Sequence, residues 1–192
     1  YRVPAEAKRA LLEHLVRSRG LNQVLCFMRT KHGASRLARQ LEKDGLVTDA
    51  IHGDKSQQTR MEALAAFKEG KLQVLVATDV AARGLDIDDL PLVVNFELPY
   101  VPEDYIHRIG RTGRAGASGE AISFVSPDEE RYLTEIERLL KKSIQILSAD
   151  GFDERELKEQ ADRVRQQLLQ VKDVNKVAIF GAQDEKVFIE IS

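Results

Sequence analysis

The sequence predicts a doubly wound α/β domain, in which helices cover both faces of a parallel sheet. Two observations carry this prediction: short apolar, β-branched runs recur along residues 1–148, and stretches with helical apolar spacing lie between them. With 192 residues and roughly 150 residues per domain, one full domain and a small appendage are expected. The content of 43% hydrophobic and 31% charged residues excludes collagen, low-complexity disorder and disulfide-stapled mini-proteins.

The elements are expected in a strict alternation. A helix is expected over about residues 5–19. Four aliphatic side chains form its apolar face, and Gly20 ends it. The expected buried strands are 23–28, 47–51, 73–77, 92–96 and 121–125. The expected helices between and after them are 32–43, 56–68, 102–111 and 127–142. Ser56 is a predicted N-cap, and Pro102 is typical of a first helical turn.

Cysteine content, hydropathy and charge restrict the function classes. The only cysteine, Cys26, has no second cysteine for a disulfide or zinc site and is expected to fill a buried strand position. No run approaches about 18 apolar residues and no charged-then-apolar leader opens the sequence, so a cytoplasmic protein is expected. The net charge is −2; residues 149–192 carry 10 acidic and 7 basic side chains, which leaves 21 acidic and 22 basic for residues 1–148. Nucleic-acid contacts must therefore come from individually placed residues.

The loops after the strands are the expected place for chemistry, because open α/β sheets bind ligands beyond the carboxyl ends of their strands. Arg29-Thr30-Lys31 follows the first strand, and His52-Gly53-Asp54 follows the second. Gly53 lets a backbone approach an extended ligand, and the helix beginning at Ser56, with Arg60 one turn inside it, offers free amides to a phosphate. For each of these signals alone, a turn glycine and a solvated arginine remain the alternative.

Two further loops are more specific. Residues 77–86 (ATDVAARGLD) interleave apolar side chains with a hydroxyl, two carboxylates and a guanidinium, and Asp86 could accept hydrogen bonds from a ribose. Residues 105–116 place Arg108, Arg111 and Arg114 three apart with glycines between them. Arginines without adjacent carboxylates repel one another unless an anion bridges them, so a phosphate is predicted here. The alternative is a solvated basic helix end.

These four loops, in this order, match one family. Arg29-Thr30 fits its motif IV, Gln57-x-x-Arg60 its Q-x-x-R motif, residues 77–86 its motif V and residues 107–114 (HRIGRTGR) its motif VI. Residues 1–148 therefore resemble the second RecA-like domain of DEAD-box ATP-dependent RNA helicases, and residues 27–142 are most similar to the bacterial RhlE type.

The resemblance implies roles for individual residues. Arg111 and Arg114 would act as arginine fingers on the γ-phosphate of ATP, and His107 would couple the nucleotide side to the RNA side. The nucleotide side would also include Arg83, Gly84 and Asp86. The strand of RNA would be held by its sugar–phosphate backbone, without base readout, by Arg29, Thr30, Gly53, Gln57, Arg60, Thr78 and Asp79.

Two motifs of the family are missing from the sequence. It contains neither G-x-x-x-x-G-K-[ST] nor D-E-A-D, so the phosphate cradle and the magnesium-binding acids are expected on a preceding RecA-like domain. ATP and Mg²⁺ would be bound mainly by that domain, with no metal site in this chain, which should be inactive alone. The alternatives are a non-enzymatic RNA-binding or assembly module, or a carrier for the appended segment.

The tail, residues 149–192, departs from the helicase pattern. A helix over 153–170 and two strands over 174–180 and 185–191 predict an α-β-β unit, too small to bury a core alone. Its strand edges would favour self-association. Residues 147–191 resemble a segment of the periplasmic porter domain of resistance-nodulation-division efflux pumps, which favours a fused, engineered or misassembled chain with a junction near residues 146–149, and the sequence does not distinguish these three. The alternative is a helicase-specific appendage with half of a ferredoxin-like topology.

Overall fold

The computed structural model describes residues 1–83, 85, 87, 90–113 and 119–147. Gly84, Asp86, Arg114 and the predicted α-β-β tail lie outside these residues. The contacts between Cα atoms divide the chain into two units, Tyr1–Ala149 and Asp150–Ser192. The description below concerns the first unit.

The first unit is built on five parallel strands in the order β2-β3-β1-β4-β5. Their bounds are β1 Val24–Met28, β2 Thr48–Ile51, β3 Val74–Thr78, β4 Leu92–Asn95 and β5 Glu120–Ser123. The three central strands are buried along their whole length, which explains their continuous apolar sequence. The predicted doubly wound α/β fold is confirmed.

Helices fill the connections, as the alternating pattern predicts. They are η1 Ala5–Ala7, α1 Lys8–Ser18, α2 Lys31–Lys43, α3 Gln57–Lys68, α4 Asp79–Ala82, α5 Pro102–Ile109, η2 Pro127–Glu129 and α6 Glu130–Leu140. Ser56 caps α3 by accepting from the Thr59 amide, and Pro102 occupies the first turn of α5, both as expected. The sequence pattern missed α4, a single turn directly after β3, because four residues are too few to show a helical period.

The last strand is shorter than predicted. Residues 121–125 were expected to form it, but β5 ends at Ser123, and Val125 instead makes an isolated parallel bridge to Arg2. The Val3 amide donates to the Val125 carbonyl at 2.9 Å, so the amino-terminal segment takes the place of a continued strand.

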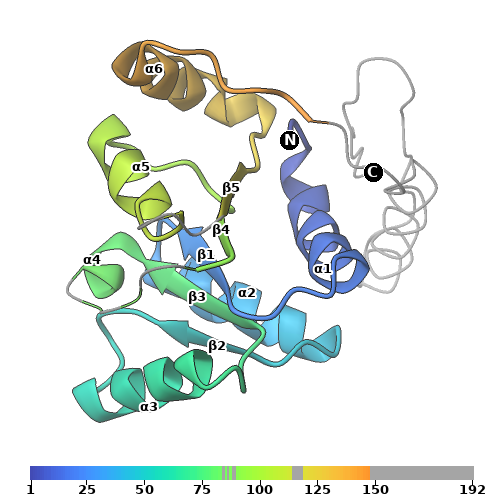
Figure 1. Cartoon of the computed structure of the whole chain (residues 1–192), viewed down its shortest axis with the longest axis vertical. Helices are drawn as coiled ribbons and strands as arrows, with labels where there is room; N and C mark the ends of the chain where they lie inside the picture. The colour runs from blue at the N-terminus through green and yellow to red at the C-terminus, as the bar shows by residue number, and fades with distance from the viewer. Residues whose placement is uncertain (84, 86, 88–89, 114–118, 148–192) are drawn as a thin grey trace, which may run out of the picture. The chain divides into compact units, whose positions relative to one another are not determined.

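The sheet separates two apolar layers. One face packs Leu25, Phe27 and Leu75 against Leu64 and Phe67 of α3. Because side chains alternate along a strand, Val24 and Cys26 point to the opposite face, where both are fully buried. Figure 1 shows α1 and α5 on opposite sides of the sheet. A smaller cluster joins α5 to α6 through Tyr105, Leu133 and Ile136.

Cys26 occupies a buried position in β1, as predicted. Its pKa is raised because burial disfavours the thiolate. Among the described residues, no helix is long and apolar enough to span a bilayer.

Candidate functional site

The predicted site residues meet at one edge of the sheet. Arg29, His52 and Asp79 each follow the last residue of β1, β2 and β3, and these strands pair in parallel register. The amino-terminal ends of α2 and α3 begin at the same edge, so their free amides accompany the side chains there. The topology therefore brings the first three predicted loops together.

Arg108 of α5 is the most enclosed cation of this edge, with 1% of its surface exposed. Its Nε and Nη2 donate to the two carboxylate oxygens of Asp79 at 2.6 and 2.7 Å. Its Nη1 donates to Asn95 Oδ1 at 3.2 Å and to the Glu97 carbonyl at 2.7 Å, and the guanidinium lies 5.0 Å from the centre of the Phe27 ring. Arg108 thereby fastens α5 to β4 and to the start of α4.

Arg108 differs from the prediction drawn from arginine spacing. The sequence predicts that Arg108, Arg111 and Arg114 lack a neighbouring carboxylate and therefore need a phosphate. The counter-ion of Arg108 is Asp79, which lies 29 positions earlier and reaches it only in the folded sheet. The Asp79 carboxylate, predicted to contact RNA, is engaged through both oxygens by Arg108, and that predicted contact stays untested.

The residues expected on the nucleotide side line a shallow pocket between α4 and α5. The Arg83 side chain is 62% exposed and pairs with Asp104. Arg111 donates to the Leu85 carbonyl at 3.2 Å, and His107 is exposed. The pocket is lined by Phe27, Asp79, Ala82, Arg83, Asp104, His107, Arg108 and Arg111. Arg83, His107 and Arg111 therefore share one surface, whereas Gly84, Asp86 and Arg114 lie outside the described residues.

Three residues expected to hold RNA lie around the helix starts. Thr30 caps α2, because its Oγ1 accepts from the Gly33 amide at 3.0 Å. Arg60 donates to Gln57 Oε1 at 3.3 Å and to the Ala81 carbonyl at 3.2 Å, so it ties α3 to α4. Its Nε is buried and has no hydrogen-bond partner in the described part of the chain.

Other residues that the sequence analysis expects to contact RNA lie in the loop after β2 and at the end of β3. A Cβ built on Gly53 would meet nothing within 4 Å, so this backbone is open to a ligand. His52 is buried, and its Nε2 lies 2.7 Å from Ser35 Oγ. Burial, followed by the charge of Lys55, lowers the pKa of His52 and favours the neutral ring. Thr78 is buried at the end of β3.

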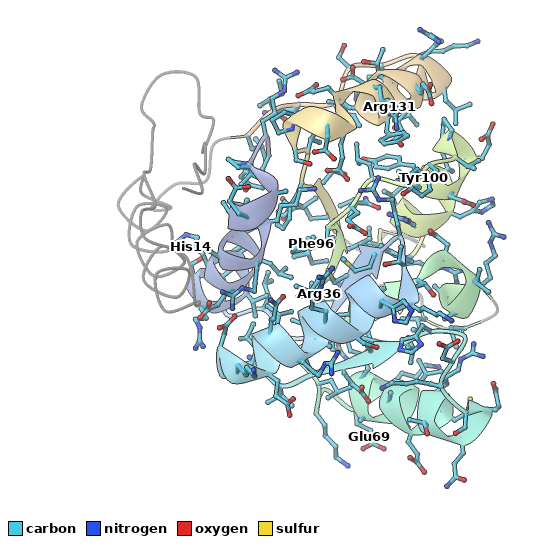
Figure 2. All side chains as sticks on the ribbon, turned by 180° about the vertical axis from the view of Figure 1, so that it is seen from behind. His14, Arg36, Glu69, Phe96, Tyr100 and Arg131 are labelled. Carbon is cyan, nitrogen blue, oxygen red and sulfur yellow. The ribbon has the colours of Figure 1, made fainter. Side chains whose placement is uncertain are left out.

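Arg29 lies in a stack of rings that the sequence reading did not anticipate. Its guanidinium lies 4.8 Å from the Tyr100 ring centre and 5.7 Å from that of Tyr132. Glu97 and Glu129 lie 3.7 and 3.5 Å from its nitrogens, and its side chain is 15% exposed. Arg29 is therefore mostly enclosed, and Tyr100, which Figure 2 labels between α5 and α6, is the exposed member of the stack.

A buried ion pair links α1 to the segment that precedes α6. Lys8 of α1 pairs with Glu129, and both are at most 3% exposed. Glu129 also accepts from the Leu98 amide at 3.0 Å and the Ser126 amide at 3.1 Å. Burial lowers the pKa of Lys8. The sequence could have indicated this pair only by a lysine and a glutamate at positions that otherwise carry apolar side chains. That the two residues meet could be seen only in the folded structure.

No group of three or more His, Cys, Asp or Glu side chains in the described part of the chain is arranged to hold a metal ion.

Comparison with known proteins gives a consistent result. The family model of the helicase conserved C-terminal domain matches residues 7–116. The ATP-dependent RNA helicase CshA of Listeria monocytogenes is 48% identical over 153 residues, which cover 80% of this chain and 29% of that protein. The ATP-dependent RNA helicase RhlB of Pseudomonas syringae is 46% identical over 75% of this chain and 36% of that protein. The chain thus spans about a third or less of these relatives.

Solved structures agree with the sequence comparisons. The Escherichia coli DEAD-box protein SrmB, solved bound to the regulator of ribonuclease activity A, has a TM-score of 0.71 at 38% identity, covering 78% of this chain and 89% of that one. Saccharomyces cerevisiae Dbp5 bound to RNA and ADP BeF3 has a TM-score of 0.70 at 33% identity, covering 84% of this chain and 43% of that one.

Proposed function

The chain belongs to the helicase conserved C-terminal domain family and is the C-terminal RecA-like domain of a DEAD-box RNA helicase. We propose that it supplies arginine fingers and half of an RNA-backbone site to an ATPase whose phosphate cradle lies on an amino-terminal RecA-like domain. The observation that supports this most is the shared sheet edge, where Arg83, His107 and Arg111 flank one pocket and Thr30 and Arg60 lie at the neighbouring helix starts.

On the nucleotide side, Arg111 and Arg114 contact the γ-phosphate when the two domains close. A guanidinium is suited to this role because its fixed fork of N–H donors matches phosphate oxygens and keeps its charge at all working pH values. The burial of Arg108 supports a different role for each of these arginines. Arg108 holds α5 in place, whereas Arg111, three residues later, lies beside the pocket. Gly84 and Asp86 would complete the nucleotide side at the ribose.

On the RNA side, the sugar–phosphate backbone lies across the starts of α2 and α3. Thr30, Gly53, Gln57, Arg60 and Thr78 supply hydroxyl, amide and guanidinium donors at this edge. Contacts of this kind bind a strand without reading its sequence. Strand separation would follow from bending the bound strand as the domains close.

ATP fits this chain only in part. Arg83 and Arg111 beside the pocket suit the outer phosphate, whereas the motifs that would cradle the phosphates and coordinate magnesium are not in the sequence. ATP and Mg²⁺ would therefore be held mainly by the amino-terminal domain, and the residues described here would orient the γ-phosphate and stabilise charge that develops on it.

The proposal also covers the domain bounds, the helicase subtype, the cellular location and the role of the tail. Residues 1–148 would form the helicase domain, of the RhlE type, and residues 149–192 a separate α-β-β appendage related to an efflux-pump porter segment. We also propose a cytoplasmic location, and self-association through the tail would be a property of the appendage alone. The alternative is an RNA-binding or assembly module without ATPase activity.

The test is ATP hydrolysis with and without single-stranded RNA, for this chain alone and joined to an amino-terminal RecA-like domain of the same family. Turnover is expected only in the joined protein. In that protein Arg111→Ala should lower kcat by about 10³-fold or more, the effect of losing an arginine finger, while the circular dichroism spectrum stays unchanged. Turnover by this chain alone, or full activity of the variant, would contradict the proposal.

A further inference from the structure

We infer that Tyr100 is a stacking site for one nucleobase of the bound RNA strand, held in position by Arg29 and Tyr132. This inference rests on the proposed RNA-binding function and extends it, since the backbone contacts above involve no base. It gives a role to an aromatic side chain that none of the four predicted loops includes.

The first argument is the exposure of Tyr100. Its surface is 59% exposed, the largest value among the described Phe and Tyr residues, although burial of a tyrosine ring would stabilise the fold. It lies in the segment between β4 and α5, at the carboxyl ends of the strands, where α5 begins two residues later. An exposed ring at the edge that carries the predicted ligand loops is available to a ligand.

The second argument is that the ring is held in place. The Arg29 guanidinium lies 4.8 Å from its centre, and the Tyr132 ring meets it edge to face with centroids 5.5 Å apart. Tyr132 is in turn covered by Arg131 of α6, whose guanidinium lies 4.6 Å from the Tyr132 centre. A ring with restricted motion loses little conformational entropy when a base stacks on it.

The third argument is continuity with the proposed backbone site. Arg29 directly precedes Thr30, the α2 cap expected to contact RNA, so the Tyr100 ring contacts a side chain of that loop. The Arg29 backbone amide donates to Glu97 Oε2 at 2.8 Å, which fixes the β1 loop to the β4 loop. A strand that contacts Thr30 through its backbone can therefore place a neighbouring base over Tyr100.

The charge of the patch suits a nucleic acid. Glu97 and Glu129 would repel a phosphate if they were free, but Arg29 lies beside both and Lys8 pairs with Glu129. Arg131 adds a further positive charge at the rim. A nucleobase is favoured over an aliphatic protein surface, because a ring beside guanidinium groups offers a flat, polarised face rather than an apolar groove.

The experiment measures binding of fluorescein-labelled single-stranded oligoadenylate of about ten nucleotides, a length within the range of single-strand sites, to the whole chain at low salt. Tyr100→Ala should weaken binding by about 5- to 150-fold, the range for loss of one stacked base. Tyr100→Phe should keep the affinity, because it keeps the π-face. Val47→Ala is the matched control, since Val47 is 52% exposed but lies just before β2, at the opposite end of the strands.

Two further readouts separate the possible failures. The chain has four tyrosines and no tryptophan, so base stacking should quench tyrosine emission in the wild type more than in Tyr100→Phe. An oligomer of abasic sites should bind the wild type and Tyr100→Ala equally. If Arg60→Ala weakens oligoadenylate binding and Tyr100→Ala does not, the stacking inference fails and the proposed function stands; Tyr100 would then suit a protein partner. If the wild type binds neither oligoadenylate nor the abasic oligomer, the stacking inference and the RNA-binding part of the proposed function both fail, whereas the ATPase part is decided by the joined protein.

Discussion

The pair Asp79 and Arg108 provides the sharpest test of how this site is built. Arg108 is 1% exposed and the Asp79 side chain 22%, and two charge-assisted hydrogen bonds of 2.6 and 2.7 Å join them. Asp79→Asn keeps the shape of the side chain but removes its charge, and leaves a buried guanidinium without a counter-ion. Breaking a buried pair in this way costs about 3–5 kcal/mol. Because Asp79 is partly exposed, we expect about 3 kcal/mol, the lower end of that range.

The assay is urea unfolding followed by far-ultraviolet circular dichroism. Arg108→Met should also destabilise the fold, because it leaves Asn95 Oδ1 and the Glu97 carbonyl without their donor. The double variant Asp79→Asn/Arg108→Met should be about 1–3 kcal/mol more stable than the two single changes added together, which is the coupling expected of contacting residues. Equal m-values would show that the unfolded states are comparable.

The result also decides the role of Asp79. If Asp79→Asn lowers the free energy of unfolding by less than about 1 kcal/mol, well below the cost of breaking a buried pair, and nevertheless reduces RNA affinity, the carboxylate acts on the ligand. The structural argument for Arg108 would then be refuted. A large stability loss with additive single changes would refute only the direct coupling between the two residues.

Three further outcomes follow from local geometry. Gly119→Ala should lower Tm by several degrees, because a Cβ there would lie 1.9 Å from Thr112 Oγ1, whereas Gly53→Ala should change Tm little, since nothing lies within 4 Å. Differential scanning calorimetry would measure both, and equal shifts would contradict the explanation. The lowered pKa of His52 means that the unfolded chain binds its proton more readily, so stability should fall as pH drops below about 6.5; His52→Gln should flatten this dependence in urea unfolding at several pH values. Cys26 should react with a thiol reagent at neutral pH only after denaturation, because burial blocks access and raises its pKa, and rapid labelling of the native chain would disagree.

The fold was predictable because its signals are local. Apolar runs such as residues 73–77 and the cap at Ser56 depend on neighbours within a few positions, and the structure confirms them with shifts of one or two residues. The single turn α4 was missed because no period can be read from four residues. The replacement of a longer fifth strand by the bridge between Arg2 and Val125 depends on a contact between the two ends of the unit.

The candidate site was predictable at the level of loops but not of individual charges. The order of the loops brought Arg29, His52 and Asp79 to one edge, as parallel strands require. The sequence could not show that Arg108 would find Asp79, because a separation of 29 residues is invisible to spacing rules. For the same reason the sequence did not predict that Arg29 would lie beside the rings of Tyr100 and Tyr132, and its expected contact with RNA stays a prediction.

Two arginines of this edge are enclosed. Arg29 lies beside Glu97 and two tyrosine rings, and Arg108 pairs with Asp79. Both act on the same short segment: Arg108 donates to the Glu97 carbonyl, and the Arg29 amide donates to the Glu97 carboxylate. Glu97 is thus held by one hydrogen bond from α5 and one from the loop after β1. It lies three residues before Tyr100, so the backbone between β4 and Tyr100 is anchored to both of these elements.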